Sequence, residues 1–395
     1  MPSLSGGGAE RMLLRLAEEF VERGIDVDLL LTRVKADNDR AVPGSLSPVR
    51  LRRCSMPVAR YLAMQAAGRQ WPHLIGPVLR AFSSSWALRY LPALADYLRE
   101  HRPDVLLSAN SWPNLVAIWA RRLAGVQSRI VVSERVQLGE RVRHLRRHAR
   151  WRNLPRLIGE FYPEAVGVIA VSEGVARDLV SSAELPPETV KFLPNPVVSS
   201  RLEEMADAPV THPWLADADI PVILGAGRLH PQKDFPSLLR AFALVREVRP
   251  ARLIILGEGD QRTTLERLAS TLGIEADFAL PGHVENPFAY MKRSSVFVLS
   301  SRYEGLPGVL IQAMACGCPV VSTDCPSGPR EIMKNGKLGA LVPVGNFEDL
   351  AKAVLDAIDE PVPAELLKAR ASNYSVQAAT DAYLQVLLPE IYPTL

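Results

Sequence analysis

Apolar and polar residues follow two spacings along the chain, and these spacings predict helices and strands in turn. Apolar residues recur at helical spacing over residues 9–24, where Gly24 follows as a helix stop, and again over residues 375–388. Short apolar runs predict strands over residues 27–31, 104–108, 129–133, 167–172, 222–226, 253–256, 296–300 and 320–322. Because strands that alternate with helices form parallel sheets covered on both faces, the pattern predicts an α/β fold.

A proline-containing, partly acidic segment breaks this rhythm between residues 193 and 221. At 395 residues the chain is also too long for one ordinary hydrophobic core. We therefore predict an N-terminal domain over residues 1–195, a second α/β domain over 196–374, and a final helix over 375–395 that packs back on the first domain.

Composition narrows the class of protein. Apolar residues make up 48% of the chain and charged residues 23%, which is the balance of a soluble globular protein. We find no apolar run long enough to span a membrane and no signal peptide, and the four cysteines have neither the spacing nor the nearby histidines of a zinc site. These features predict a cytoplasmic protein with reduced thiols and no bound metal.

Charge is unevenly distributed. Residues 1–200 hold 28 Lys and Arg against 19 Asp and Glu, a net charge of +9, whereas residues 201–395 carry −6. Much of the excess lies in one basic run, made up of Arg135, Arg141, Arg143, Arg146, Arg147, Arg150, Arg152 and Arg156. The run is either a solvated helix face or a surface for anionic lipid or a phosphorylated acceptor. The second interpretation would place the protein peripherally at the inner face of a cytoplasmic membrane. No nucleic-acid-binding module accompanies the run.

The first domain offers several candidates for binding. Gly6, Gly7 and Gly8 precede the first helix, so their backbone N–H groups could receive an anion, although glycines also form plain turns. Ligands of parallel sheets bind beyond the carboxyl ends of the strands. Candidate residues at such ends are Asn110, Glu134, Arg135 and Ser172. The stretch 56–98, rich in Leu, Ala and aromatic residues, either packs in the core, which we favour, or presents an apolar face.

The second domain carries the stronger signals. Arg228 and Lys233 follow a strand on one loop, where two cations suit a diphosphate. After a later strand, Glu304 precedes a helix that begins near Pro307, and the helix N-terminus offers N–H donors to an anion. Glu304 could accept hydrogen bonds from sugar hydroxyls or could simply cap the helix. The amide of Gln312 could contact a ribose.

An ordered set of motifs in this half of the chain resembles the retaining glycosyltransferases of family 4. The set comprises Gly227-Arg228-x4-Lys233, Leu253-Ile254-Ile255-Leu256-Gly257-Glu258-Gly259, Pro281-Gly282-His283-Val284-x-Asn286, Glu304-Gly305 and the run from Ala313 to Val321. The likeness covers almost the whole chain. It implies the GT-B fold, in which two Rossmann-like domains with parallel sheets face a central cleft, and the use of nucleotide sugars without a catalytic metal.

Carried over by position, the resemblance implies a role for each matching residue. Arg228 and Lys233 would bind the donor diphosphate and, with Glu304 on the sugar hydroxyls, form the catalytic set. Gly7 and Gly8 would approach the diphosphate from the first domain. The remaining donor contacts would be His283 and Val284 near the nucleobase, Gly305, Leu306, Pro307, Gly308 and Val309 around the sugar and phosphate, and Gln312 at the ribose.

Three departures from the family pattern stand out. The family has two glutamates with seven residues between them. Here the first is Glu304, and the second is replaced by Gln312, whose amide still donates and accepts hydrogen bonds. A histidine of the first domain's active-site loop is replaced by the segment Ser133-Glu134-Arg135. We expect Glu134 and Arg135 of this segment, with Asn110 and Ser172, to lie on the acceptor side. The family usually places a strand directly before the glycine-rich turn, where this sequence has Met1; because loss of that strand would leave neighbouring strands unpaired, we expect the native start to lie upstream.

The sequence thus predicts transfer of a hexose or N-acetylhexosamine from a UDP- or GDP-sugar to a hydroxyl acceptor, with retained anomeric configuration. The acceptor would be a bacterial cell-envelope glycan, such as lipopolysaccharide, capsule or exopolysaccharide, or its lipid-linked precursor. Alternatives are an inverting transferase or a nucleotide-sugar epimerase on the same fold, and a catalytically silent protein that binds sugar nucleotides.

Overall fold

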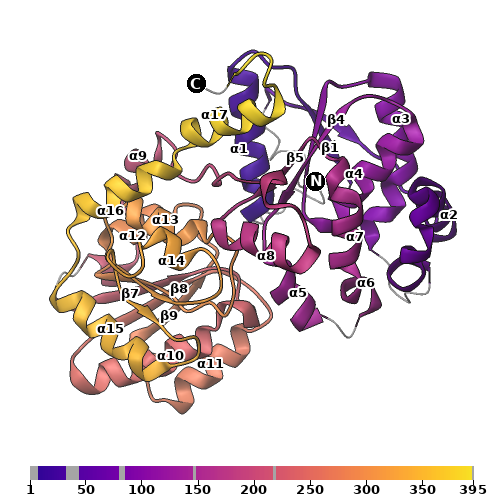
Figure 1. Ribbon diagram of the computed structural model, residues 1–395. Coiled ribbons are helices and arrows are strands. Elements are labelled where there is room, and N and C mark those ends of the chain that lie inside the picture. Colours follow the sequence, from indigo (N-terminus) through magenta and orange to yellow (C-terminus); the bar gives the residue numbers. More distant parts are fainter. Residues whose placement is uncertain (1–7, 33–43, 80–84, 146–147, 217–218, 394–395) are drawn as a thin grey trace. The chain divides into compact units, whose positions relative to one another are not determined.

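The structure is a computed structural model that describes residues 8–32, 44–79, 85–145, 148–216 and 219–393 (Figure 1). The chain forms two compact units: unit 1 comprises Met1–Pro196 and Val376–Leu395, and unit 2 comprises Val197–Ser375. Every strand pair in either unit is parallel. Each unit is therefore an α/β structure of the predicted class.

Unit 1 contains two separate parallel sheets among its described residues. The smaller pairs β1 with β2, and the larger has the order β3-β4-β5-β6. Their strands are β1 (Asp28–Leu31), β2 (Ser47–Arg50), β3 (Val105–Ala109), β4 (Arg129–Glu134), β5 (Gly167–Ala170) and β6 (Val190–Phe192). The α-helices are α1 (Gly8–Glu22), α2 (Met56–Ala67), α3 (Leu91–His101), α4 (Ser111–Ala124), α5 (Leu138–Leu145), α6 (Ala149–Arg152), α7 (Leu154–Phe161), α8 (Glu173–Ala183) and α17 (Val376–Leu387).

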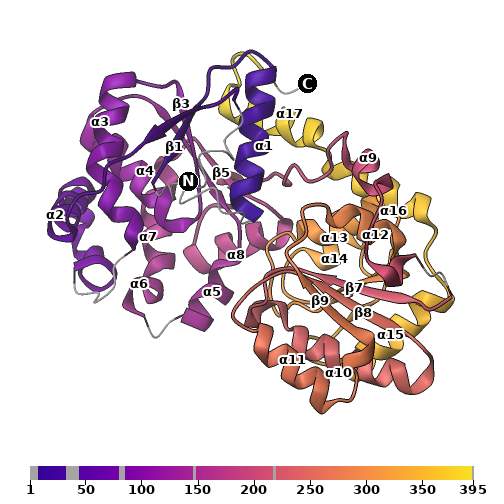
Figure 2. The ribbon, with the colours of Figure 1, turned by 180° about the vertical axis from the view of Figure 1, so that it is seen from behind.

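Helix α1 joins the two sheets of unit 1 because its apolar residues point in two directions. Leu16 and Phe20 pack with β4, β5 and the last helix, α17, in one buried cluster. Ala17 packs with Leu29 and Leu31 of β1 in a second cluster. The final helix therefore belongs to unit 1, although it follows unit 2 in the sequence, and Figure 2 shows it beside α1.

Unit 2 is built around one six-stranded sheet. Its strands are β7 (Val222–Ala226), β8 (Arg252–Leu256), β9 (Phe278–Gly282), β10 (Val296–Leu299), β11 (Val320–Thr323) and β12 (Leu341–Val342). Its α-helices are α9 (Leu202–Asp207), α10 (Phe235–Val248), α11 (Arg262–Thr271), α12 (Pro287–Arg293), α13 (Gly308–Ala315), α14 (Pro329–Ile332), α15 (Phe347–Asp359) and α16 (Ala364–Ala371). Apolar residues of β7, β8, β10, α10 and α15 form its main core.

The order of these six strands is β12-β11-β10-β7-β8-β9, so the chain moves outward from β7 in one direction and later returns to add β10 on the other side. Adjacent strands β7 and β10 are therefore followed by loops that leave the sheet toward opposite faces. In such sheets a ligand binds beyond the carboxyl ends of the strands at this switch point. The fold itself thus selects the loops after β7 and β10 as the place to look for a site.

The elements predicted from apolar spacing are confirmed, with ends that differ by a few residues. Four strands were not predicted, namely β2, β6, β9 and β12. Of these, β6 is an edge strand with exposed Lys191 and Phe192, so it lacks the apolar pattern on which the prediction depended. None of the described helices is long and apolar enough to cross a membrane.

Candidate active site

The loop after β7 is held by close backbone packing against the loop after β8. The Gly227 N–H donates to the Leu256 carbonyl at 2.9 Å, and the Leu229 N–H donates to the Glu258 carbonyl at 2.9 Å. Gly257 has φ of +148°, and a Cβ on it would lie 1.9 Å from the Gly227 oxygen. Only glycine allows this approach, which fixes the backbone on either side of Arg228.

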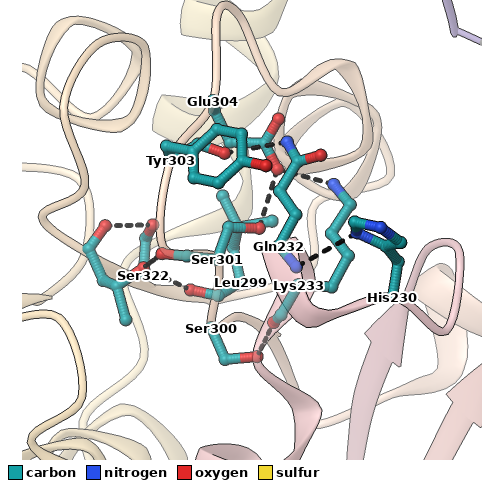
Figure 3. A network of polar contacts seen from close by, with 10 residues as sticks. His230, Gln232, Lys233, Leu299, Ser300, Ser301, Tyr303, Glu304 and Ser322 are labelled. Carbon is teal, nitrogen blue, oxygen red and sulfur yellow. Dashed lines mark hydrogen bonds and ion pairs between the residues drawn. The ribbon is translucent and has the colours of Figure 1, made fainter. Parts of the chain in front are cut away.

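Lys233 and Glu304 form an ion pair at the switch point. Lys233 ends the short 3₁₀ helix η8 (Pro231–Lys233), and its Nζ donates to Glu304 Oε1 at 2.6 Å. The side chains are only 18% and 10% exposed, and the Ser301 hydroxyl donates to the same carboxylate oxygen at 2.7 Å (Figure 3). A cation and an anion are therefore held side by side, each with further hydrogen-bonding capacity toward a ligand.

Backbone contacts lock the two loops together. The Arg302 N–H donates to the Gln232 carbonyl at 2.8 Å, and Gln232 Nε2 donates back to the Tyr303 carbonyl at 2.9 Å. The Ser300 hydroxyl donates to the Lys233 carbonyl at 2.7 Å. Figure 3 shows Gln232 and Lys233 of the first loop facing Ser300, Tyr303 and Glu304 of the second. The ion pair thus rests on a rigid frame rather than on two free side chains.

The end of β11 and the loop that follows it support the segment that leads into α13. The Thr323 hydroxyl donates to the Ser301 carbonyl at 2.6 Å, and the Ser327 hydroxyl donates to the Gly305 carbonyl at 2.8 Å. Gly328 has φ of +90°, and a Cβ on it would lie 2.5 Å from Pro307 Cδ. Helix α13 begins at Gly308, so its N-terminal N–H groups directly follow this braced segment.

The other predicted donor contacts of unit 2 lie at the same edge of the sheet. Arg228 is exposed, and its guanidinium has no hydrogen bond or ion pair with any residue that the structure describes. Gln312 is half-buried on α13. His283 and Val284 directly follow β9, and His283 is exposed. Leu306 and Pro307 are buried, whereas Val309 is half-buried.

A buried thiol lies close to the ion pair but has no nucleophilic character. Cys325 is 2% exposed. Burial raises its pKa to about 12, and the nearby Glu304 carboxylate adds to the increase. The thiol is therefore protonated at neutral pH and inert. All four cysteines are free, and no group of three or more His, Cys, Asp or Glu side chains among the described residues could hold a metal ion.

The candidates of unit 1 do sit at the carboxyl ends of strands, but most are buried. Asn110 caps α4 with φ of +75° and is partly exposed. Ser172 is 0% exposed, and its hydroxyl accepts from the Val175 N–H at 3.1 Å as the cap of α8. Gly8 begins α1, and Gly7 lies outside the described residues. Ser172 thus caps α8, and its acceptor-side role stays a prediction.

Glu134 and Arg135 point to opposite sides of the sheet and are both buried. Glu134 accepts hydrogen bonds from Tyr162, Ser111 and Asn114, and burial raises the pKa of its carboxyl. The Arg135 guanidinium donates to Ser133 Oγ and to the Tyr383 hydroxyl of α17, each at 3.1 Å. Including Arg135 in a surface basic run was therefore wrong, because its guanidinium instead ties α17 to the sheet.

Some supporting residues were not given a role by the sequence. Ser301, at the start of the segment, donates to the Glu304 carboxylate, and Thr323, which ends β11, and Ser327, in the loop after β11, donate to carbonyls of the same segment. A Ser-Gly-Pro turn at residues 327–329 was the available signal for the third brace. Nothing local in the sequence marks the first two.

Comparisons with known proteins agree with this geometry. The family described as Glycosyltransferase Family 4 matches residues 6–201, and the family described as Glycosyl transferases group 1 matches residues 212–375. An N-acetylgalactosamine-N,N'-diacetylbacillosaminyl-diphospho-undecaprenol 4-alpha-N-acetylgalactosaminyltransferase of Campylobacter jejuni is 30% identical over 280 residues, covering 70% of this chain and 74% of that enzyme. The chain belongs to glycosyltransferase family 4. It is an enzyme that transfers sugars.

Other similar proteins give the same picture for this glycosyltransferase. The lipopolysaccharide core biosynthesis glycosyltransferase LpsE of Rhizobium meliloti is 34% identical over 175 residues, covering 43% of this chain and half of that protein. Two solved structures, each 19% identical, share the fold. The lipopolysaccharide outer core galactosyltransferase WaaB has a TM-score of 0.72, and the match covers 98% of both chains. HepE of Anabaena, solved with UDP and glucose, has a TM-score of 0.74, and the match covers 98% of this chain and 97% of HepE. The fold is GT-B.

Proposed function

We propose that this glycosyltransferase moves a hexose or N-acetylhexosamine from a UDP- or GDP-sugar to a hydroxyl of a bacterial cell-envelope glycan or its lipid-linked precursor. The observation that carries the proposal is the Lys233–Glu304 pair at the switch point of unit 2, next to the N-terminus of α13. The pair offers a cation for a diphosphate and a carboxylate for sugar hydroxyls within one hydrogen bond of each other.

In the proposed reaction, no protein side chain forms a bond to the sugar. The bond between the anomeric carbon and the diphosphate oxygen breaks, and the acceptor oxygen bonds to that carbon on the same face. The acceptor proton passes to an oxygen of the departing diphosphate, so the nucleoside diphosphate leaves and the anomeric configuration is retained. Lys233, Arg228 and the α13 N–H groups stabilise the charge on the leaving group, and no catalytic metal takes part.

The relatives support the choice of substrates. The Campylobacter enzyme carries diphospho-undecaprenol in its name, and the Rhizobium protein is named for lipopolysaccharide core biosynthesis. HepE was solved with UDP and glucose. A diphosphate-linked donor and an envelope acceptor are the simplest substrates in keeping with all three.

A thermal-shift screen of nucleotide sugars tests the proposal, because a ligand that binds the folded state raises the melting temperature. We expect UDP- or GDP-sugars to stabilise the protein and the matching donor to be consumed when an acceptor glycan is supplied. NMR of the product would then report the anomeric configuration. An inverted product would favour the inverting alternative, and binding without turnover across the panel would favour a silent binding protein.

Restoring the family's second glutamate tests the ribose contact. We expect Gln312→Glu to lower the KM for the donor by a few-fold with little change in kcat, because a carboxylate accepts two hydrogen bonds from neighbouring ribose hydroxyls. Steady-state kinetics with varied donor would measure the change. The same substitution at the exposed Gln65 of unit 1 is the control. A donor KM that is unchanged or higher in Gln312→Glu would argue against a ribose contact at this position.

We further propose that this glycosyltransferase attaches peripherally to the anionic inner face of a cytoplasmic membrane through its basic run. Of that run, Arg143, Arg152 and Arg156 are exposed, while Arg146, Arg147 and the side chain of Arg150 lie outside the described residues. Arg141 lies 5.2 Å from the Trp151 ring centroid. Each cation near an anionic surface contributes on the order of 1 kcal/mol to binding.

Reversing the three exposed charges should weaken this attachment. We expect the triple variant Arg143→Glu, Arg152→Glu and Arg156→Glu to lose at least about tenfold in affinity for phosphatidylglycerol vesicles at low salt. Cosedimentation with the vesicles would measure it. The control reverses three exposed charges of unit 2, at Arg240, Arg267 and Lys352. Equal loss in both variants would indicate that net charge, not this surface, determines binding.

A further inference from the structure

Helix α2 has an inverted apolar pattern. Its buried residues are all alanines, at positions 59, 63, 66 and 67. Its larger side chains Val58 and Tyr61 are 47% and 56% exposed, and Trp71 on the following 3₁₀ helix η2 (Gly68–Leu74) is 43% exposed. A surface helix ordinarily turns its large apolar residues inward. Here the fully buried positions are small residues, while Val58, Tyr61 and Trp71 face outward.

Among the described residues of unit 1, six large apolar side chains are exposed, and Val58, Tyr61 and Trp71 are three of them. The others are Val166, Phe192 and Ile391, which belong to other elements. Half of these exposed side chains therefore lie within one stretch of 14 residues, from Val58 to Trp71, whereas the other three are single residues far apart in the sequence. Concentration of this kind marks an interaction site rather than the usual scatter of single apolar residues.

The stretch is firmly anchored in this orientation. Arg122 of α4 donates through Nη1 to the Ala66 carbonyl at 2.8 Å and to Gln70 Oε1 at 3.1 Å. The same guanidinium pairs with Glu164 at 2.6 Å. Because these bonds fix the end of α2 and the start of η2, Tyr61 and Trp71 cannot turn inward without breaking them.

The charges around the stretch indicate what covers it. Between Asp39 and Asp96 the sequence has no acidic residue and eight arginines. Arg52 and Arg53 lie just ahead of α2 and Arg69 lies in η2, and all three are exposed. We call these three arginines together with Val58, Tyr61 and Trp71 the α2–η2 surface. Its apolar and cationic groups complement a partner that is apolar inside and anionic at its surface.

We propose that the α2–η2 surface inserts into the headgroup region of an anionic lipid bilayer. Tyr and Trp favour the boundary between headgroups and acyl chains, and arginines bind the lipid phosphates. In both views of the ribbon α2 lies at the outer margin of unit 1 (Figures 1 and 2). The π-helical turn η3 (Ile75–Leu79), which follows η2, packs against α6, so the surface continues toward Arg152 of the basic run. The inference rests on the proposed membrane attachment and adds an apolar, salt-resistant component to it.

Vesicle cosedimentation over a salt series tests this inference on the full-length protein. With phosphatidylcholine–phosphatidylglycerol vesicles, we expect the wild type to keep measurable binding at high salt, where charge attraction is screened. The variant Tyr61→Ser with Trp71→Ser should lose at least about tenfold in affinity at every salt concentration. The control, Val248→Ser with Leu366→Ser, removes two exposed apolar side chains of unit 2 and should bind like the wild type.

Tryptophan quenching by brominated lipid reports insertion directly. Quenching should fall in Trp71→Phe and stay unchanged in Trp214→Phe, a matched change in unit 2. The inference would be overturned if the Tyr61→Ser, Trp71→Ser variant bound vesicles as tightly as the wild type. It would also be overturned if the wild type formed a dimer in solution and these substitutions made it monomeric. Nucleotide-sugar binding by thermal shift is measured in parallel. If the wild type binds no nucleotide sugar, the proposed transfer reaction is contradicted. If the wild type binds a nucleotide sugar but not the vesicles, only the membrane proposals are contradicted.

Discussion

Replacing Lys233 with alanine should lower kcat/KM for the sugar donor by about 100-fold or more. The substitution removes the cation that is held against Glu304 at 2.6 Å, and loss of a single charge-stabilising donor typically costs 100- to 1,000-fold in rate. Donor consumption at varied nucleotide-sugar concentration would measure the change. The donor KM should rise and kcat should fall, because a diphosphate contact acts on the bound donor and on the leaving group.

The matched control is Lys292→Ala, which removes a lysine of the same unit that pairs with the exposed Asp207 on the surface. Its kinetics should match the wild type. In Lys233→Ala the Glu304 carboxylate loses its contact with Lys233 and keeps its hydrogen bond from Ser301. The melting temperature of the variant should therefore also be recorded. Wild-type kinetics in a folded Lys233→Ala protein would remove the basis for the proposed donor site.

Replacing Gly257 with alanine should destabilise the protein by about 3 kcal/mol or more. The new Cβ would lie 1.9 Å from the Gly227 oxygen, and φ of +148° is unfavourable for any residue with a side chain. For a unit of this size that loss corresponds to a fall of about 6–12 °C in melting temperature. Relief of the clash would move the loop that carries Arg228, so the donor KM should rise as well.

The variant Gly273→Ala separates the effect of the steric clash from the effect of the positive φ. Gly273 also has a positive φ, of +66°, but a Cβ there would meet no atom within 4 Å. This variant should lose only about 1 kcal/mol and keep its donor kinetics. If Gly257→Ala were no less stable than Gly273→Ala, the close approach between the two loops would not be what positions Arg228.

The two loops of the donor site illustrate how far local pattern reaches. Lys233 and Glu304 were each selected as donor contacts by their place after a strand and by the family motifs. Their direct contact was not foreseen, because they are 71 residues apart and meet only where β7 pairs with β10. The braces from Thr323 and Ser327 depend in the same way on the return of the chain through β11.

The first unit shows where local reasoning failed. Glu134 and Arg135 look alike as polar residues beyond a strand, and both were predicted to face an acceptor. Neighbouring residues of an extended chain point to opposite sides, so Glu134 enters a pocket of Tyr162, Ser111 and Asn114 while Arg135 turns to α17. Residues of α4 and Tyr162 bury Glu134, whereas a helix from the far end of the chain buries Arg135.

The stretch 56–98 was assigned to the core, and the alanines of α2 do pack inward. The exposure of Tyr61 and Trp71 became visible only when the position of α4 and the Arg122 contacts were known. Helical spacing alone does not say which side of a helix faces the core when both sides carry apolar residues.

The sequence by itself determined the α/β class, most strands and helices, the family, and the residue types of the donor site. It could do so because side-chain periodicity and motif chemistry are local properties of the chain. Only the tertiary structure decided the order of the strands, the Lys233–Glu304 pairing, the burial of Glu134 and Arg135, and the outward face of α2. These depend on contacts between residues far apart in sequence, and the free energy of such contacts is fixed only when distant elements pack together.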